Sequence, residues 1–338
     1  MTQPECGSAA SRDRAPTPVT CLVGESDAMH HVRTLIGRVA GTDASVLVVG
    51  ESGTGKELVA QALHAGSARS TGELHAVNCG AIPASLIEAE LFGYEKGSFT
   101  GASRTHDGIA ARASGGTLFL DEITEMPMEM QPPLLRFLET QRYFRVGGTR
   151  EMSTDVRFIA ATNRSPVAAV RENKLREDLY YRIAVFPIEL PPLRQRGEDV
   201  VELAELFLER MNQTSERDRR FSRSSLDAAR RHGWPGNVRE LKHAVEYAYI
   251  VGDGEVDLCT AIGRASDLTA PPPARDPPRD SELRVRIGSR LCDVERSVIE
   301  ATLARFAGNK RRTAEVLGCS VKTLYNKLNR YAGLASEF

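Results

Sequence analysis

The sequence lacks the features that mark secreted, membrane-bound and disulfide-scaffolded proteins. Its six cysteines are widely spaced with no CxxC pair, which argues against a zinc site or a disulfide framework and favours a reducing compartment. The first residues, MTQPECGSAASRDRAPTP, contain no apolar core of a signal peptide. No apolar run is long enough to span a membrane. These absences predict a soluble, cytoplasmic protein with no membrane partner.

A large net charge of either sign is also missing. The chain has 44 basic and 45 acidic residues, which excludes a uniformly basic nucleic-acid binder but allows a local basic patch. Its 338 residues, 41% of them hydrophobic, suffice for one large core and a smaller second domain.

Between residues 20 and 190, short apolar runs alternate with helical patterns. The predicted strands are Ser45–Gly50, His75–Cys79, Thr117–Asp121, Val156–Asn163 and Val185–Leu190. Buried parallel strands separated by helices have this rhythm, so the pattern predicts a doubly wound α/β domain.

The rest of the chain divides by composition. Residues 1–19 are small, polar and Pro-containing, which predicts a disordered tail. Residues 191–264 show only helical periodicity and predict a small helical subdomain, while 265–284 are rich in Pro and charge and predict a linker. Residues 285–338 are again helical and locally basic.

The segment GESGTGKE follows an apolar strand and opens a helical pattern, which is the context in which GxxxxGK binds phosphate. Lys56 is expected to reach the β- and γ-phosphates. The generic motif ends in Ser or Thr, so Glu57 would approach Mg²⁺ through water or leave that role to Thr54. A glycine-rich turn that binds nothing is the disfavoured alternative. The candidate nucleotide-binding residues are Gly50, Glu51, Ser52, Gly53, Thr54, Gly55, Lys56 and Glu57.

Two acids end the strand GGTLFLDEI, and a polar pair ends the strand FIAATN. At the carboxyl edge of a sheet, Asp121 can hold Mg²⁺ and Glu122 can orient an attacking water. The alternative is a pair of solvated carboxylates at a strand end with no role in catalysis. Thr162 and Asn163 would lie beside the γ-phosphate if their strand neighbours the first; the alternative is a turn capped by Asn163.

The tail AGNKRRTAEVLGCSVKTLYNKLNRYAGL predicts two short helices joined by a tight turn, as in a helix-turn-helix. Seven basic residues and one acid lie between Arg305 and Arg330, which suits DNA phosphates. A plain amphipathic hairpin that dimerises the protein is the alternative. The candidate DNA-contacting residues are Lys310, Arg311, Arg312, Ser320, Lys322, Thr323, Asn326 and Lys327.

Taken together, the chain resembles the sigma-54-dependent transcriptional activators, which are bacterial enhancer-binding proteins. The resemblance covers nearly everything after residue 19 and rests on eight motifs in order: GESGTGKELVAQALH, ELFGYEKGSFTGA, GGTLFLDEI, FIAATN, REDLYYRI, FPIELPPLRQRGED, WPGNVREL and NKRRTAEVLGCSVKTLYNKL. It implies an AAA+ ATPase fold with a helical lid and a Fis-type helix-turn-helix, and Glu57 is usual in this family.

The resemblance also implies a role for YEKGSFTGA, whose Phe99 would otherwise be expected to pack inward in a tight turn. In the family the matching loop contacts sigma-54, and Phe99 and Thr100 match the contact residues. The usual GAFTGA carries Ala where this chain has Ser98. The candidate contact loop is Gly97, Ser98, Phe99, Thr100, Gly101 and Ala102.

Other roles follow only from the resemblance. Asn78 would relay the γ-phosphate state from Glu122 to this loop, and Arg239 would sense the nucleotide from the lid. Arg176 and Arg182, which spacing alone would place as surface arginines on a helix, would act on a neighbour's nucleotide. EMPMEMQP would form a second pore loop, although its methionines could equally be core.

The resemblance finally implies partners and a mechanism. We expect ATP and Mg²⁺ as cofactors, upstream DNA, sigma-54 RNA polymerase, and self-association from a dimer to a hexameric ring. About 19 residues precede the ATPase, so no receiver or sensor domain is expected, and regulation would come from a separate protein, from expression or from a paralogue. The rivals are a DNA-binding repressor with a vestigial or ligand-sensing ATPase fold, and a helicase-like remodeller.

Overall fold

The computed structural model describes residues 22–99, 102–215, 217–252, 254–262, 290–306 and 309–333. Its contacts divide the chain into two units, one within residues 1–269 and one within 270–338, and each is described by itself. The predicted tail 1–19 and linker 265–284 lie outside the described residues. No helix in the described part of the chain is long and apolar enough to cross a membrane.

The larger unit is built on a five-stranded parallel sheet in the order β2-β5-β8-β1-β9. All five predicted strands are confirmed, each within a residue or two of its expected ends. They are β1 (Val46–Val49), β2 (Leu74–Asn78), β5 (Thr117–Asp121), β8 (Arg157–Thr162) and β9 (Phe186–Glu189).

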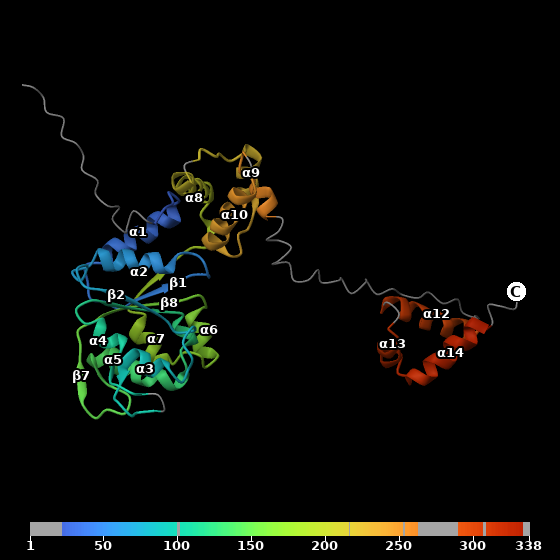
Figure 1. Ribbon diagram of the computed structural model, residues 1–338, viewed down its shortest axis with the longest axis horizontal. Coiled ribbons are helices and arrows are strands. Elements are labelled where there is room, and N and C mark those ends of the chain that lie inside the picture. Colours follow the sequence, from blue (N-terminus) through green and yellow to red (C-terminus); the bar gives the residue numbers. More distant parts are fainter. Residues whose placement is uncertain are drawn as a thin grey trace, which may run out of the picture. The chain divides into compact units, whose positions relative to one another are not determined.

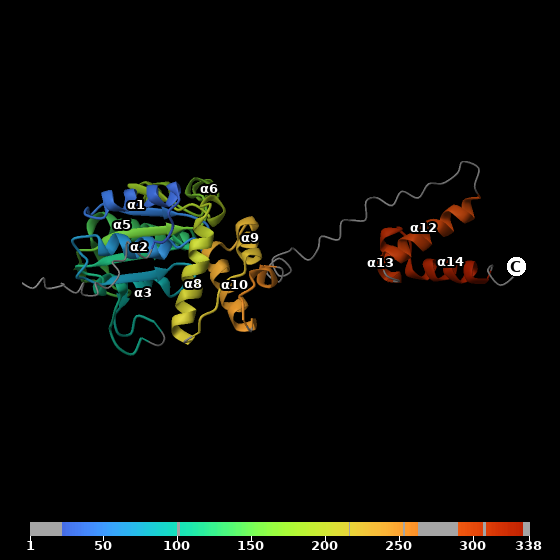
Figure 2. The same cartoon turned by 90° about the horizontal axis from the view of Figure 1, so that it is seen from above.

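Helices cover both faces of the sheet, as Figures 1 and 2 show. On one face α1 (Asp27–Val39) and α2 (Lys56–Ala65) pack on those strand side chains that point to this face, such as Phe119. On the other face the alternate residues, such as Leu118 and Leu120, join a separate core. The helices of that second core are α3 (Ile87–Phe92), α4 (Ile109–Arg112), α5 (Gln131–Thr140), α6 (Pro166–Arg171) and α7 (Glu177–Ile183). Burial on both faces explains why the strands read as continuous apolar runs.

Short elements that the sequence did not predict complete this unit. Two small antiparallel pairs form, β3 (Gly93–Tyr94) with β4 (His106–Asp107), and β6 (Arg142–Phe144) with β7 (Glu151–Ser153). The segment EMPMEMQP (125–132) runs from the end of the single turn η2 (Ile123–Glu125) through the single turn η3 (Met128–Met130) into the start of α5. Met126 and Met130 are core residues, whereas Met128 is exposed.

A helical lid follows β9. It begins with the turn η4 (Leu193–Gln195) and continues with α8 (Asp199–Ser215), α9 (Arg223–Arg231) and α10 (Asn237–Val251). Its core surrounds Trp234, whose indole Nε1 donates to the Ala229 carbonyl at 2.8 Å.

The smaller unit contains α12 (Leu291–Arg305), α13 (Lys310–Val316) and α14 (Val321–Gly333) around Ile299, Ala314 and Leu324. Asn309 accepts the Arg312 N–H at 3.2 Å and caps α13. Gly318 adopts the left-handed conformation (φ 66°), and the Ser320 hydroxyl accepts the Thr323 N–H at 3.1 Å to open α14. Gly318 and Ser320 lie between α13 and α14 and shape the tight turn of a helix-turn-helix.

Candidate functional site

The candidate nucleotide site lies where β1, β8 and β5 end side by side, because these strands are parallel neighbours in the sheet. Lys56 opens α2, and its Nζ donates to the Gly50 and Glu51 carbonyls at 2.9 and 3.2 Å. Burial lowers the pKa of Lys56, and the nearby carboxylates of Asp121 and Glu122 oppose this. A cation therefore faces two acids at one sheet edge, where a Mg²⁺–triphosphate fits the charges of both.

The phosphate loop itself depends on glycine at two positions. Gly53 (φ 77°) and Gly55 (φ 104°) lie in the left-handed region, and a Cβ on Gly53 would stand 2.4 Å from the Gly236 carbonyl of the lid. Thr54 is buried, with its hydroxyl donating to the Glu51 carbonyl at 2.7 Å, whereas Glu57 is exposed on the first turn of α2. Because Glu57 is exposed, it remains open to a water-mediated contact.

Asp121 and Glu122 lie at the end of β5, and the backbone turns sharply between them and the next segment. The Asp121 carboxylate accepts the Glu122 N–H at 3.0 Å, and Glu122 is in the left-handed region (φ 52°). Such strain in a non-glycine residue is typical of functional positions. An ideal Cβ on Gly80 would lie 2.8 Å from Glu122 Oε2 and 3.4 Å from Asn78 Oδ1. Gly80, which the sequence did not indicate, thus leaves room for the Glu122 carboxylate beside Asn78.

The Asn78 side chain is held by the backbone that follows β2. Its Oδ1 accepts N–H groups from Gly80 and Ala81 at 2.9 and 3.0 Å. Asn78 also stands opposite Asp121 in the sheet register. The structure therefore brings Asn78 to the acidic end of β5.

Thr162 and Asn163, at the end of β8, differ in burial. Thr162 is fully buried, and its hydroxyl bonds to the Thr124 hydroxyl at 3.0 Å and accepts the Arg164 N–H at 3.1 Å. Asn163 is exposed and lines an adjoining pocket. Of the two side chains, only that of Asn163 is accessible to a ligand in this pocket.

Arg176 and Arg182 are directed elsewhere in their own chain. Arg176 caps α7 and pairs with Asp178 at 2.8 Å, and Arg182 Nη2 donates to the Leu138 carbonyl at 2.8 Å. Both are exposed. The partners of these two arginines are thus Asp178 and Leu138, and neither partner belongs to the phosphate loop.

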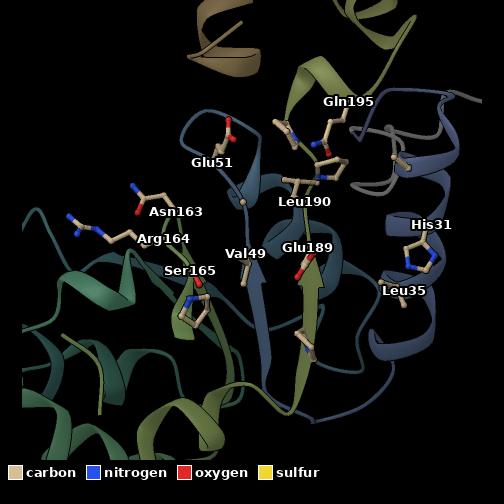
Figure 3. A pocket seen from close by; sticks show the side chains of 16 residues that line it. His31, Leu35, Val49, Glu51, Asn163, Arg164, Ser165, Glu189, Leu190 and Gln195 are labelled. Carbon is tan, nitrogen blue, oxygen red and sulfur yellow. The ribbon is translucent and has the colours of Figure 1, made fainter. Parts of the chain in front are cut away.

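A pocket of about 720 Å³ adjoins the phosphate loop at Gly50 and Glu51. Figure 3 shows its walls: α1 with His31 and Leu35, the segment after β8, and the β9–lid connection. The contribution of α1 was missed, although its helical pattern, DAMHHVRTLIGRV, was visible in the sequence. The full lining is Ala28, His31, Leu35, Val49, Gly50, Glu51, Asn163, Arg164, Ser165, Pro166, Pro187, Glu189, Leu190, Pro191, Pro192 and Gln195.

The lid contacts the phosphate loop directly. Arg239 Nη1 donates to the Ser52 hydroxyl at 3.1 Å, and its backbone N–H donates to the Gly53 carbonyl at 3.3 Å. Arg194 and Asn237, which the sequence did not single out, both bond to the Glu51 carboxylate. Nucleotide bound at this loop would therefore be in reach of the lid.

The candidate contact loop lies between β3 and β4 and stands away from the sheet (Figure 2). Phe99 is 40% exposed and packs edge-on against Tyr94, with ring centroids 5.0 Å apart. It is thus neither fully free nor packed inward. The Gly97 N–H donates to the Ala102 carbonyl at 2.8 Å, which closes the base of the loop. Thr100 and Gly101 lie outside the described residues.

The base of this loop is tied to the β6–β7 segment. Arg145 pairs with Glu95 at 2.8 Å and with Asp107 at 2.5 Å, so one guanidinium holds both sides of the loop. Ser98 lies against Gly147, where an added Cβ would be 2.7 Å from the Ser98 Cβ.

The second unit presents polar side chains from α14 and α13. Lys322, Thr323 and Asn326 are exposed on α14, as are Arg311 and Arg312 on α13. Four expected DNA contacts are partly engaged within the unit: the Ser320 and Thr323 hydroxyls bond to each other at 2.7 Å, Lys327 pairs with Glu295, and Lys310 lies 4.3 Å from the Tyr325 ring centroid. The sequence did not indicate Tyr325, because its cation–π contact depends on the packing of two helices.

These features define a class: a P-loop NTPase with an AAA+ lid and a separate helix-turn-helix. Models of protein families match in the same order. The sigma-54 interaction domain matches residues 22–189, the AAA+ ATPase lid domain 194–266, and the Fis-family bacterial regulatory protein 290–331.

Known proteins agree with this class. The transcriptional regulatory protein ZraR of Klebsiella oxytoca is 45% identical over 91% of this chain and 68% of its own length. The regulatory protein LuxO of Vibrio parahaemolyticus is 41% identical over 92% and 69%. The crystal structure of NtrX from Brucella abortus in complex with ATP is similar at a TM-score of 0.65 and 34% identity, over 91% of this chain and 68% of that one. The chain therefore belongs to the sigma-54-dependent transcriptional regulators.

Proposed function

We propose that the protein hydrolyses ATP and uses the reaction to remodel the sigma-54 RNA polymerase closed promoter complex. The observation that carries this proposal is the junction of Lys56, Asp121 and Glu122 at one sheet edge. The solved relative in complex with ATP supports nucleotide binding at the equivalent fold.

Each group in the site has a role in phosphoryl transfer. The N–H groups of the phosphate loop and the amino end of α2 hold the phosphates, while Lys56 neutralises the β- and γ-oxygens. Asp121, with Thr54 or a water on Glu57, would hold Mg²⁺, which supplies charge neutralisation on the phosphates when bound. Glu122 orients the attacking water, and Asn163 faces the γ-phosphate.

Arg176 and Arg182 serve the site of a neighbouring subunit in a ring, which we propose to be a hexamer. Both are exposed and already bonded away from their own phosphate loop, which supports action in trans. Arg239 of the lid reaches Ser52 and senses the bound nucleotide. Asn78 passes the state of Glu122 towards α3 and the contact loop.

The loop from Gly97 to Ala102 contacts sigma-54 through Phe99 and Thr100. A change in nucleotide must alter the free energy of this contact, since otherwise hydrolysis could do no work on the partner. The helix-turn-helix binds upstream DNA through the basic side chains of α13 and the exposed polar face of α14.

The test is the ATPase rate per subunit against protein concentration, with capture of sigma-54 in the presence of ADP–aluminium fluoride. We expect the rate to rise with concentration, Glu122→Gln to abolish it, and Thr100→Ala to hydrolyse ATP but lose sigma-54. A wild type that hydrolyses nothing and never captures sigma-54 would favour the repressor instead.

A further inference from the structure

A carboxylate occupies the second position of the phosphate loop. Glu51 lies between Gly50, which adjoins the pocket, and Ser52, which contacts the lid. A triphosphate entering this loop brings several negative charges, so an unpaired carboxylate here would oppose its binding. If the loop binds a triphosphate, the charge of Glu51 therefore needs a partner.

Arg194 compensates this charge. Its Nη2 donates to Glu51 Oε1 at 2.6 Å and its Nη1 donates to Oε2 at 2.8 Å, a two-pronged pair in which both carboxylate oxygens are engaged. The bonds from Arg194 and then Asn237 lower the pKa of Glu51 to about 2. Glu51 is therefore ionised and paired under ordinary conditions.

Asn237, the first residue of α10, holds the same carboxylate. This residue is fully buried, and its Nδ2 donates to Glu51 Oε2 at 3.1 Å and to the Ser52 carbonyl at 3.0 Å. Its Oδ1 accepts the Leu193 N–H at 2.8 Å. Asn237 is also in the left-handed region (φ 53°), which asparagine tolerates better than most residues. One amide thus joins the loop to both η4 and the start of α10.

The neighbouring lid contacts reach other atoms of the loop, including the Ser52 hydroxyl that accepts from Arg239. Arg196 Nη2 donates to the Thr54 carbonyl at 3.0 Å, and the Arg239 N–H donates to the Gly53 carbonyl. These bonds fix the loop but leave the Glu51 charge unchanged. Arg194 is the guanidinium that neutralises it.

We propose that Arg194, with Asn237, forms a lid latch on Glu51 that removes the negative charge of this carboxylate from the path of the incoming triphosphate. Arg194 and Asn237 are positioning residues, because they act through Glu51 and not on the nucleotide. The inference rests on the proposed ATPase function, and it adds a determinant of ATP affinity to the lid.

The experiment measures the dissociation constant for ATPγS with Mg²⁺ by calorimetry on the full chain. Arg194→Ala should weaken binding about three- to tenfold, a range set by the partial exposure of the pair, with 46% of the Arg194 and 41% of the Glu51 side chain accessible. Arg194→Lys, which keeps the charge, should bind more tightly than Arg194→Ala. Glu51→Gln combined with Arg194→Ala should recover most of the affinity, because the unpaired charge is gone.

Arg230→Ala is the matched control. Arg230 is a lid arginine of similar exposure (40%) that pairs with Glu198 and Asp227 inside the lid. Its variant should bind ATPγS as the wild type does.

Two results would overturn the latch: an Arg194→Ala variant that binds as the Arg230→Ala variant does, or a double variant as weak as Arg194→Ala alone. Loss of binding that persists in the double variant would mean that Arg194 serves folding or packing. Because the readout is binding, a wild type that binds ATPγS but hydrolyses no ATP would refute the proposed function and leave the latch testable.

Discussion

Ser98 packs against Gly147, and the Ser98 hydroxyl is buried there without a hydrogen-bond partner. This contact docks the candidate contact loop on the segment between β6 and β7. Leaving a buried hydroxyl unpaired costs about 1–3 kcal/mol, so serine weakens the docked position relative to the alanine of the usual GAFTGA motif.

Ser98→Ala should therefore hold the loop more tightly. We expect slower hydrogen–deuterium exchange, by about fivefold or more, in peptides covering residues 93–98 and 145–148, as the removed penalty predicts. Ser103→Ala, at an exposed serine of the same loop, is the control and should leave exchange unchanged. Faster exchange in Ser98→Ala would show that the hydroxyl stabilises the docked loop.

Gly80→Ala should lower the ATPase rate with little effect on nucleotide affinity. The new Cβ would meet Glu122 Oε2 at 2.8 Å, which displaces the carboxylate proposed to orient water but leaves the phosphate loop intact. We expect kcat to fall about tenfold or more at an unchanged KM for ATP, as misplacement of a catalytic group does. Gly41→Ala, where nothing lies within 4 Å of the new Cβ, is the matched control. An equal loss in both variants would argue against this role of Gly80.

Much of this fold was predictable because its determinants are local. The strands at Val46–Val49 and Thr117–Asp121 are buried on both faces, so their sequences are nearly all apolar and bounded by glycine or acid. The capping roles of Asn309 and Ser320 were likewise visible, since a cap and its helix are adjacent in the chain.

What was missed depends on contacts between distant segments. Arg157 reads as a charge that interrupts a strand, yet it is 1% exposed and donates to the Val39 and Ala40 carbonyls at the end of α1. No pattern around Arg157 marks those partners, which lie more than a hundred residues earlier. The roles of Gly80 and Asn237 escaped for the same reason, because tertiary packing and not local periodicity creates them.

The stability of the lid contact should depend on pH in a defined window. The pKa of Glu51 falls from its ordinary 4.5 to about 2 in the folded protein, so folding favours the ionised form. Its contribution is complete above about pH 4.5 and is lost as the pH falls towards 2. We expect the wild type to unfold in urea at higher concentrations than Glu51→Gln near pH 7, and this gap to shrink by pH 3.

Glu88→Gln, at an exposed acid of α3, controls for the loss of one negative charge. Its difference from the wild type should stay small at both pH values. An advantage of wild type over Glu51→Gln that is equal at pH 7 and pH 3 would contradict the assignment of this stability to the ionised carboxylate.

Helices α13 and α14 of the smaller unit should contribute differently to DNA binding. Arg312→Ala should weaken all sequences alike and reduce the slope of log affinity against log salt by about 1, because an exposed arginine on α13 suits a phosphate. Asn326→Ala should alter sequence preference, because Asn326 is exposed on the helix expected in the major groove. Fluorescence anisotropy with an operator selected from random DNA, at several salt concentrations, measures both.

Lys327→Ala is the comparison within the same unit. Lys327 pairs with Glu295 of α12, so its loss should change the salt slope less than the loss of Arg312. If Arg312→Ala, Asn326→Ala and Lys327→Ala all kept the wild-type slope of log affinity against log salt, neither Arg312 nor Lys327 would contact the DNA backbone.

The pairing of β3 with β4 sets Gly93 opposite Asp107, so the chain leaves and re-enters the ATPase unit at one point. The segment between them is bounded by this pairing, and Arg145 ties both of its sides to the β6–β7 segment through Glu95 and Asp107. This pairing therefore marks where the segment proposed to contact sigma-54 joins the rest of the unit. If this segment contacts sigma-54 as proposed, its exchange between two relatives should alter that contact and leave nucleotide binding unchanged.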